Sequence, residues 1–233
     1  MRMRYLIKYT KEDKLKFLSH LDLMKTIHRL IRRSGIDVGF SQGYNPHILM
    51  SIAQPLSVGM SSKGEYLDLV LHEDMDEKEL VESLNEVTVG GIKFINACKV
   101  ITEKKAPQAM ALIDAARYAI KLKCNDPKKA EESLKELMKK ETFVTLKKSK
   151  RGEKEADIKP LIKELKFWAM DDALIMNVLI SCGSRENLSA NLVGQYVSKN
   201  IEGVDMDAFV YVERIEMYAD RDGTLVELER YFR

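Results

Sequence analysis

The sequence predicts an α+β protein built from two tandem domains, each with the order β-α-β-β-α-β and an antiparallel sheet. Three observations lead to this fold class. With 233 residues, the chain is long for one ordinary domain and suits two of roughly 100–120 residues each. Stretches of helical and strand periodicity alternate in the same order in both halves. Residues 103–115 separate the halves and are expected to be a linker with some helical character.

The first helix is the clearest element of the first half. Apolar residues recur at helical spacing from Leu21 to Ile31. Ser19 precedes them, and Ser19 and Asp22 have the spacing of a capping box, with Asp in place of the usual Glu. Gly35 follows as an end signal, so we expect a helix between Ser19 and Gly35.

Strands surround this helix and one further helix. The predicted elements of the first domain, residues 1–102, are strands at 3–10, 36–40, 48–53, 65–72 and 91–101 and a second helix capped by Asp74 or Asp76. Residues 55–64 are expected to be a loop. Spacing alone leaves open whether 36–40 or 48–53 is the second strand of the sheet. In either case, the order is that of a ferredoxin-like domain.

The same order is expected in the second domain, residues 116–233. Its predicted elements are strands at 117–124 and 142–149, a hairpin of 165–169 and 173–181, a strand at 209–219, and helices at 127–140 and 187–201. Pro127 lies near the first helical position, and Asn187 is the expected cap of the last helix. Extra strand material around residues 150–169 is the one departure from the order of the first domain.

Composition and charge argue against several classes of protein. Lys and Arg number 38 and Asp and Glu 36, so any attraction to phosphate must come from local patches rather than from the net charge of +2. Cys98, Cys124 and Cys182 are far apart, which argues against a disulfide framework and a cysteine zinc site. No apolar stretch reaches the roughly 18 residues that cross a bilayer, and the first residues lack the apolar run of a signal peptide. We therefore expect a cytoplasmic protein without a cofactor and outside the membrane.

His20 and His47 are the candidate catalytic residues, together with Asp22. His20 lies in the first turn of the first helix, where the dipole disfavours the imidazolium and leaves the neutral form that a general base requires. The alternative for His20 is a surface histidine without a special role. The two histidines and Asp22 also suggest a metal site or an acid–base pair, but their separation is not a metal-ligand spacing. No metal site is therefore predicted, and the sequence has no recognised catalytic motif.

The segment Gln42-Gly43-Tyr44-Asn45-Pro46-His47 is the first candidate binding site. Its side chains donate and accept hydrogen bonds, and its glycine lets the backbone approach a ligand closely. An aromatic ring beside amides and a histidine suits a nucleobase or a ribose. A rigid structural turn is the alternative, because the proline restricts the residue before it.

The densest basic run of the chain is the second candidate binding site. Its members are Lys147, Lys148, Lys150, Arg151 and Lys154. Several cations together release condensed counterions, so such a run suits contact with phosphate groups. The alternative is a solvated hairpin or loop without a ligand.

Four segments resemble the radical-SAM-linked protein family, whose activity is unknown: FLSHLDLM (17–24), SQGYNPH (41–47), PLSVG…EYLDL (55–69) and KKSKRGEKEADIKPLIKEL (147–165). One departure is Ile48, where members often have a second proline. The resemblance implies a protein encoded beside, or fused to, a radical-SAM protein that often carries a cobalamin-binding domain. This chain lacks the Cys-x-x-x-Cys-x-x-Cys triplet and would be the accessory half. A fainter resemblance, of fold alone, is to the CRISPR-repeat-processing endoribonucleases, which pair two ferredoxin-like domains and often cleave RNA with a histidine.

Three functions fit these observations. The leading hypothesis is a non-catalytic accessory module that binds ribosomal or transfer RNA and presents it to a radical-SAM partner for modification. The alternatives are a metal-independent endoribonuclease that uses His20 or His47, and a docking partner of a radical-SAM protein that binds no nucleic acid. The residues expected to contact RNA are Ser19, His20, Gln42, Gly43, Tyr44, Asn45, His47, Lys147, Lys148, Lys150, Arg151 and Lys154.

Overall fold

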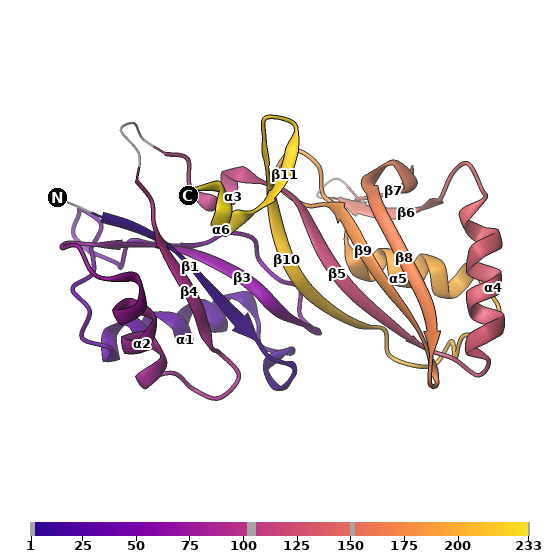
Figure 1. The fold of residues 1–233 in the computed structure, drawn as a ribbon, viewed down its shortest axis with the longest axis horizontal. Coiled ribbons are helices and arrows are strands. Elements are labelled where there is room, and N and C mark those ends of the chain that lie inside the picture. Colours follow the sequence, from indigo (N-terminus) through magenta and orange to yellow (C-terminus); the bar gives the residue numbers. More distant parts are fainter. Residues whose placement is uncertain (1–2, 102–105, 150–151, 233) are drawn as a thin grey trace. The chain divides into compact units, whose positions relative to one another are not determined.

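The structure of the protein is a computed structural model that describes residues 3–101, 106–149 and 152–232 (Figure 1). Helices and mostly antiparallel strands alternate along the chain, which confirms the predicted mixture of helices and sheet. The chain forms two compact units. The first unit is Met1–Asp114 with Glu216–Arg233, and the second is Ala115–Ile215. Strand β10 (Tyr211–Arg221) contributes residues to both units.

The first unit has the element order β-α-β-β-α-β. Its elements are β1 (Met3–Lys11), a 3-10 turn (Asp13–Leu15), α1 (His20–Arg33), β2 (Met50–Ile52), β3 (Met60–Leu71), α2 (Glu77–Glu86), β4 (Phe94–Lys99) and the short helix α3 (Ala109–Leu112). β1 pairs antiparallel with β3 and β4, and β2 pairs antiparallel with β3. The strand order is therefore β4-β1-β3-β2, and β10 also lies beside β3.

One face of this sheet carries the hydrophobic core of the first unit. Successive side chains of a strand point to opposite faces, so alternate residues of β1 and β3 are buried together with the apolar side of the helices. The core contains Tyr5, Ile7 and Tyr9 of β1, Leu67, Leu69 and Leu71 of β3, Leu23, Ile27, Leu30 and Ile31 of α1, and Leu80 and Leu84 of α2. The helical spacing in the sequence thus marks the buried side of α1, as predicted.

Two predicted segments of the first unit differ from the structure. Residues 36–40 do not form the expected strand, because Val38 and Phe40 make only isolated bridges. The second strand of the unit is β2, which lies inside the predicted run 48–53. Residues 60–64 were expected in a loop but belong to β3, because the end of β1 pairs with this part of β3.

Residues 216–233 pack within the first unit, although the sequence analysis assigned them to the second domain. After β10 come β11 (Thr224–Glu227) and α6 (Leu228–Tyr231), and β11 pairs antiparallel with the end of β10. The side chain of Asn96 in β4 donates a hydrogen bond to the Glu229 carboxylate at 3.3 Å. Such contacts with the first sheet are between residues far apart in sequence, which periodicity cannot reveal.

The second unit has the same element order with one hairpin inserted. Its elements are β5 (Ile113–Lys123), α4 (Pro127–Met138), β6 (Val144–Ser149), β7 (Gly152–Asp157), a 3-10 turn (Lys159–Leu161), β8 (Ile162–Met170), β9 (Ala173–Ser181), α5 (Ala190–Asn200) and the first part of β10. The strand order is β10-β5-β9-β8, and β9 pairs antiparallel with β5 and β8. β6 and β7 form a separate two-stranded sheet. The predicted strand 142–149 therefore belongs to an insertion, because β8 takes the position beside β9.

α5 packs closely against the sheet of the second unit. It begins at Ala190, and its N-cap is Ser189 rather than the predicted Asn187. A Cβ atom at position 194, which is a glycine, would lie 2.8 Å from Val210 Cγ1 and 3.2 Å from Ile120 Cγ2. A glycine at this position therefore permits the close approach of helix and sheet.

Candidate functional site

α1 begins at the capping box that the sequence predicts. The Ser19 hydroxyl accepts a hydrogen bond from the Asp22 backbone N–H at 3.2 Å and donates one to the Asp22 carboxylate at 2.7 Å. Lys25 Nζ lies 3.7 Å from the same carboxylate. These contacts satisfy a free backbone donor of the first turn, so Ser19 and Asp22 both stabilise the start of α1.

His20 and His28 are half-buried histidines of the same helix. Nδ1 of His20 and Nε2 of His28 are buried and form no hydrogen bond with the residues that the structure describes. The pKa of His28 is lowered, first by burial and then by the charges of Arg32 and His47. His28 is therefore neutral at neutral pH, and a neutral imidazole is able to accept a proton.

Ser41 and His47 close the base of the loop that carries the predicted binding residues. The Ser41 N–H donates a hydrogen bond to the His47 carbonyl at 2.9 Å, and the His47 N–H donates one to the Ser41 hydroxyl at 3.1 Å. The same hydroxyl oxygen lies 3.0 Å from Nδ1 of the His47 ring. The two ends of the loop are thus held together by three polar contacts.

The tip of this loop lies in solvent. Gln42, Asn45 and Pro46 are exposed. Tyr44 is fully exposed, because its accessible area is 107% of the reference value for a free tyrosine residue. Gly43 has a φ of +124°, a conformation that L side chains rarely adopt. The structure therefore combines a loop with a fixed base and an aromatic side chain that is fully accessible.

His47 brings the loop towards the second half of α1. Its charge lowers the pKa of His28, which lies about 12 Å along the helix axis from His20. His47 thus contributes to the electrostatic environment of His28, a residue that the sequence analysis did not select as a candidate.

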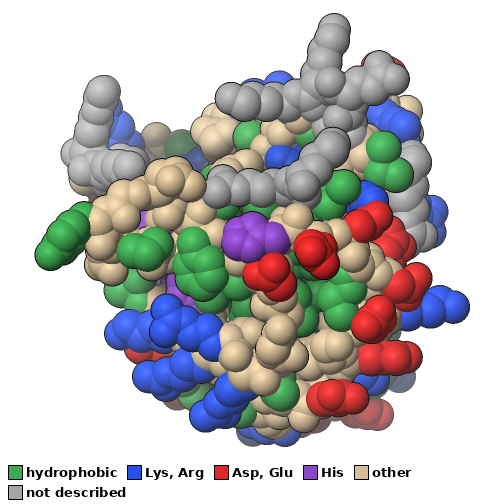
Figure 2. Space-filling model, turned by 90° about the vertical axis from the view of Figure 1, so that its left-hand side faces the viewer, with side chains coloured by type: hydrophobic (Ala, Val, Ile, Leu, Met, Phe, Trp, Pro, Cys, Tyr) green, Lys and Arg blue, Asp and Glu red, His purple; other side chains and the backbone are tan. Residues whose placement is uncertain are grey.

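Three arginines lie beyond His28 on the exposed side of α1. Arg29, Arg32 and Arg33 form no salt bridge with any residue that the structure describes. Figure 2 shows a face of the first unit on which Lys and Arg side chains gather in one area and Asp and Glu side chains in another. We call the exposed residues Arg29, Arg32, Arg33, Tyr44 and His47 the α1–loop surface. The sequence analysis did not include these arginines among the candidate ligand contacts.

The basic run of the second unit lies on the inserted hairpin. Lys147 of β6 is half-buried and faces Lys154 of β7 in the antiparallel register. Lys150 and Arg151 lie outside the described residues, and so does the side chain of Lys148. Like charges directly opposite each other on a hairpin are unfavourable unless an anion lies near them.

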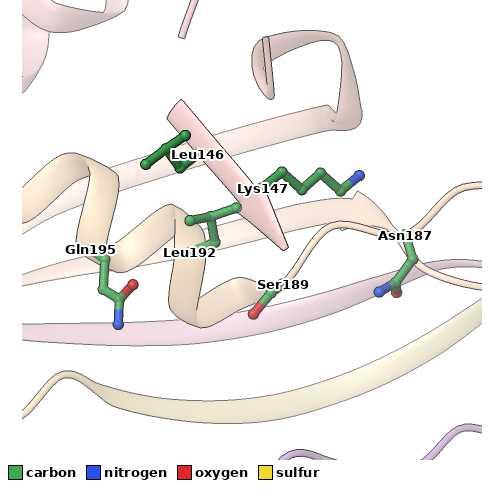
Figure 3. Close-up of a pocket in the computed structure, with 6 residues that line it drawn as sticks. All are labelled: Leu146, Lys147, Asn187, Ser189, Leu192 and Gln195. Atoms are coloured by element: carbon green, nitrogen blue, oxygen red, sulfur yellow. The ribbon is translucent and has the colours of Figure 1, made fainter. Parts of the chain in front are cut away.

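A pocket of about 260 Å³ lies where this hairpin meets the start of α5 (Figure 3). It is lined by Leu146, Lys147, Asn187, Ser189, Leu192 and Gln195. Leu192 extends from α5 towards the strand that carries Leu146 and Lys147 (Figure 3). Of these residues, the sequence analysis selected only Lys147 as a binding residue. The pocket joins residues about 40 positions apart, so no local motif marks it.

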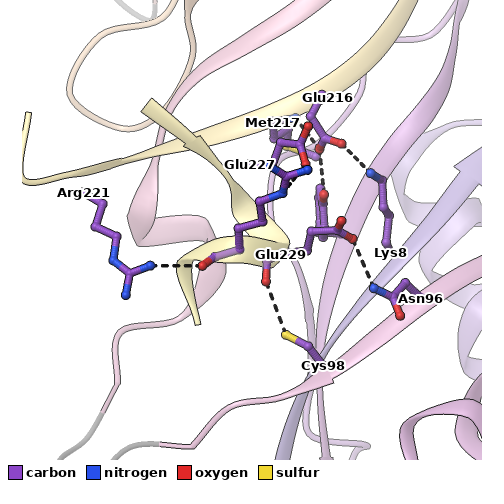
Figure 4. A network of polar contacts seen from close by, with 10 residues as sticks. Lys8, Asn96, Cys98, Glu216, Met217, Arg221, Glu227 and Glu229 are labelled. Atoms are coloured by element: carbon purple, nitrogen blue, oxygen red, sulfur yellow. Dashed lines mark hydrogen bonds and ion pairs between the residues drawn. The ribbon is translucent and has the colours of Figure 1, made fainter. Parts of the chain in front are cut away.

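On the face of the first unit's sheet opposite the hydrophobic core, Lys8 and Glu216 form an ion pair with each other (Figure 4). Glu216 is 6% exposed. The hydroxyl of the buried Tyr66 donates a hydrogen bond to Glu216 Oε1 at 2.7 Å. Figure 4 also shows Cys98 and Asn96 of β4 meeting Glu229. This network attaches the C-terminal residues to the sheet and is structural.

Other classes of site have little support in the described residues. No group of three or more His, Cys, Asp or Glu side chains among them is arranged to hold a metal ion. Cys98, Cys124 and Cys182 are buried and do not form disulfides. Within the described ranges, we find no helix with the length and apolar character needed to cross a membrane.

The fold and these surfaces define a mixed α/β protein with antiparallel strands and two candidate binding regions. A family described as uncharacterised proteins conserved in bacteria (DUF2344) matches residues 4–190. The chain belongs to this family. A solved structure titled as an unknown protein from Galdieria sulphuraria is 11% identical, covers 92% of this chain and 99% of its own, and has a TM-score of 0.26, too low to support an argument. No curated protein matches the chain.

Proposed function

We propose that this protein binds RNA through the α1–loop surface and acts as the accessory module of a radical-SAM enzyme that modifies the RNA. The observation that carries the proposal is the fully exposed Tyr44, on a loop whose His47 acts on the same histidine of α1 as Arg32, in a helix whose arginines form no salt bridge with the described residues. An exposed aromatic ring offers a face on which a base stacks, and arginines contact the phosphates beside it.

The loop is suited to this role because polar contacts within the protein hold its base. The contacts between Ser41 and His47 fix its base, so little conformational entropy is lost when a ligand binds to the tip. Gln42 and Asn45, on either side of Tyr44, offer amide donors and acceptors for base edges. These features support recognition of unpaired nucleotides rather than of a regular duplex.

We also infer that each unit is a ferredoxin-like (βαββαβ) domain. The strand orders β4-β1-β3-β2 in the first unit and β10-β5-β9-β8 in the second support this inference, because both place the first and third strands of the unit in the centre. The fold alone does not imply a function, so the RNA proposal depends on the surface and not on the domain type.

The radical-SAM partner is proposed from the resemblance of the segments around FLSHLDLM and SQGYNPH. The three isolated, buried cysteines fit an accessory role, because they offer no set of thiolates for an iron–sulfur cluster. A partnership with ribosomal or transfer RNA would place the protein in the cytoplasm.

The proposal is tested by measuring the affinity for transfer RNA and ribosomal RNA fragments at about 50 mM and about 200 mM salt. The double variant Arg32→Glu and Arg33→Glu should bind at least about tenfold more weakly and show a smaller salt dependence, because it removes phosphate contacts. Lys128→Glu, which reverses the charge of a single exposed residue of α4, is the control for an unrelated charge reversal and should bind like the wild type. Absence of RNA binding by the wild type at the lower salt concentration would contradict the proposal.

Tyr44 allows a second, independent arm of this test. Tyr44→Ala should weaken binding by about 1–3 kcal/mol without changing the salt dependence, because it removes stacking and no charge. Tyr44→Phe keeps the ring and should bind like the wild type. If Tyr44→Ala and Tyr44→Phe change the RNA-binding affinity equally, the proposal that a base stacks on Tyr44 is wrong.

A metal-independent endoribonuclease is the second candidate function, and the neutral His28 beside His47 favours it. Such an enzyme needs a neutral histidine to take the proton of a ribose 2′-hydroxyl and cations to stabilise the phosphorane. It predicts cleavage of RNA in the presence of EDTA, with loss of cleavage in His28→Ala, His47→Ala or His20→Ala. RNA that stays intact after prolonged incubation excludes it. Co-purification of a radical-SAM protein without RNA would instead favour a protein-only docking function.

A further inference from the structure

We propose that the pocket between the inserted hairpin and α5 of the second unit binds a single nucleotide, with the base against the apolar part of the lining and the phosphate at Lys147. The six lining residues that the structure describes all belong to the second unit. The inference rests on the proposed RNA binding, because it assigns a second contact to the same class of ligand.

The size of the pocket restricts the ligand. Its volume of about 260 Å³ lies slightly below the range of roughly 300–1,000 Å³ that is typical of small-molecule sites. A base with its sugar and one phosphate is of this size, whereas a folded nucleic acid or a large cofactor is not. The pocket therefore suits one nucleotide, either free or at an unpaired position of an RNA strand.

The apolar part of the lining suits a flat ring. Leu146 comes from β6 and Leu192 from α5, so the two side chains approach the pocket from different elements (Figure 3). Leu146 is 55% exposed, so part of its side chain is accessible to a ligand. Bases held outside a helical stack are commonly placed between apolar or aromatic side chains. A bound base would cover the exposed leucine and contribute favourable burial.

The polar part of the lining suits the rest of a nucleotide. Asn187, Ser189 and Gln195 form no side-chain hydrogen bond with the residues that the structure describes. An amide offers both a donor and an acceptor, the combination needed to bond the edge of a base or a ribose hydroxyl. The Ser189 hydroxyl does not cap α5, although Ser189 occupies the N-cap position. Three uncommitted polar groups around one pocket thus match the several donors and acceptors of a nucleoside.

The charge of the lining selects for an anion. Lys147 is the one ionised residue among the six, and none of them is acidic. Its cross-strand neighbour Lys154 has the same charge, so a phosphate near Lys147 would relieve their repulsion. A cationic or purely apolar ligand would gain no favourable electrostatic interaction with Lys147 and Lys154.

The test uses the full chain with ¹³C-labelled leucine methyl groups, followed by NMR during additions of AMP, CMP, GMP and UMP. The signals of Leu146 and Leu192, assigned with the variants Leu146→Ile and Leu192→Ile, should shift together and saturate. Ribose 5-phosphate and inorganic phosphate are the controls for charge alone, and they should shift these signals little. Equal shifts with inorganic phosphate, or no shift with any nucleotide, would overturn the proposal.

Variants connect the pocket to its ligand. Lys147→Gln should weaken mononucleotide binding by about tenfold, because it removes a charge-assisted contact to the phosphate. Lys128→Gln, on the exposed side of α4, is the matched control and should leave binding unchanged. Unchanged mononucleotide affinity in Lys147→Gln would also count against the proposal. The melting temperature of Lys147→Gln should not fall below that of the wild type, since the Lys147 side chain makes no ion pair with the described residues and faces the like-charged Lys154.

The two sources of the nucleotide are separated by a short single-stranded oligoribonucleotide. If it shifts the same methyl signals at lower concentration than the mononucleotides, the pocket binds one position of an RNA strand. If only the free nucleotides bind, the pocket is a mononucleotide site. In both cases the proposed ligand class stands.

The failure of this inference can be distinguished from the failure of the proposed function. In one case, RNA binding requires Arg32 and Arg33 but is unaffected by Lys147→Gln, and the leucine signals do not respond to nucleotides. This result supports the α1–loop surface as an RNA-binding site and contradicts nucleotide binding in the pocket. In the other case, the leucine signals shift with nucleotides but the protein binds no structured RNA. This result supports nucleotide binding in the pocket and contradicts the proposed function.

Discussion

The first unit carries its candidate ligand contacts on a helix and a short loop, whereas the second unit carries them on an inserted hairpin and a pocket. In the first, the connection between α1 and β2 contains the loop with Tyr44. In the second, β6 and β7 lie between α4 and β8 and supply Lys147. The framework of strands and helices has the same order in both. The difference teaches that the candidate sites lie on the parts that the two units do not share.

The two units also differ in how they hold charged residues. The Lys8–Glu216 pair of the first unit is nearly buried, with side-chain exposures of 16% and 8%. The Arg117–Glu164 pair of the second unit is more accessible, with exposures of 23% and 32%. Breaking a buried pair leaves a charge without a partner, whereas water replaces the partner of an accessible one.

The largest effect is expected for Glu216→Ala. It leaves the ammonium of Lys8 and the hydroxyl of Tyr66 without their partner, which should lower the free energy of unfolding by about 3 kcal/mol. Urea denaturation measures this change, and amide hydrogen exchange should place it in the strands of the first unit. Glu164→Ala is the matched control in the second unit and should have a clearly smaller effect. Equal losses for the two variants would show that burial of the pair does not matter.

A medium effect is expected for the serines at the N-caps of α1 and α5. Ser19 accepts a hydrogen bond from the backbone N–H of Asp22, whereas Ser189 makes no side-chain capping bond. Ser19→Ala should therefore lower the free energy of unfolding by about 1 kcal/mol, and Ser189→Ala should change it by much less. Thermal unfolding of both variants measures the difference. Similar losses in both would contradict the assigned capping contacts.

The smallest effect is the dependence of stability on pH through His28. The folded protein lowers the pKa of this histidine below the ordinary value of 6.5, so the unfolded chain binds the proton more readily. The contribution of His28 to stability is therefore complete above pH 6.5 and is lost as the pH falls through the lower pKa of the folded state. The variant His28→Asn should show a smaller loss of stability between about pH 7 and about pH 5 than the wild type. Their difference at about pH 8 measures the packing effect alone. Equal slopes would contradict the lowered pKa.

Local signals in the sequence were sufficient for much of this framework. The apolar spacing of α1, the Ser19–Asp22 box and the hairpin of β8 and β9 all depend on residues close together in the chain. Propensity and periodicity report such interactions directly. The exposed position of the loop at residues 42–47 also follows from its Gly, Asn and Pro content.

The remaining features depend on contacts between distant residues. Residues 36–40 have the composition of a strand, but tertiary packing leaves them with isolated bridges. The hairpin of β6 and β7 differs from a strand of the main sheet only in its pairing partner. The effect of His47 on the pKa of His28 and the pocket at Lys147 likewise join separate segments. Periodicity cannot predict any of these features, because each depends on tertiary contacts between segments that are far apart in the sequence.

The ion pair between Lys8 and Glu216 spans 208 positions of the chain. Protein synthesis adds roughly 5–20 residues per second, so the carboxylate follows its ammonium partner after roughly 10–40 s. During that time the β1 strand emerges from the ribosome with its lysine unpaired and one face of its sheet uncovered. Synthesis of the first unit therefore begins first and ends last, because its residues come from both ends of the chain. All residues of the second unit are synthesised before the last residues of the first unit.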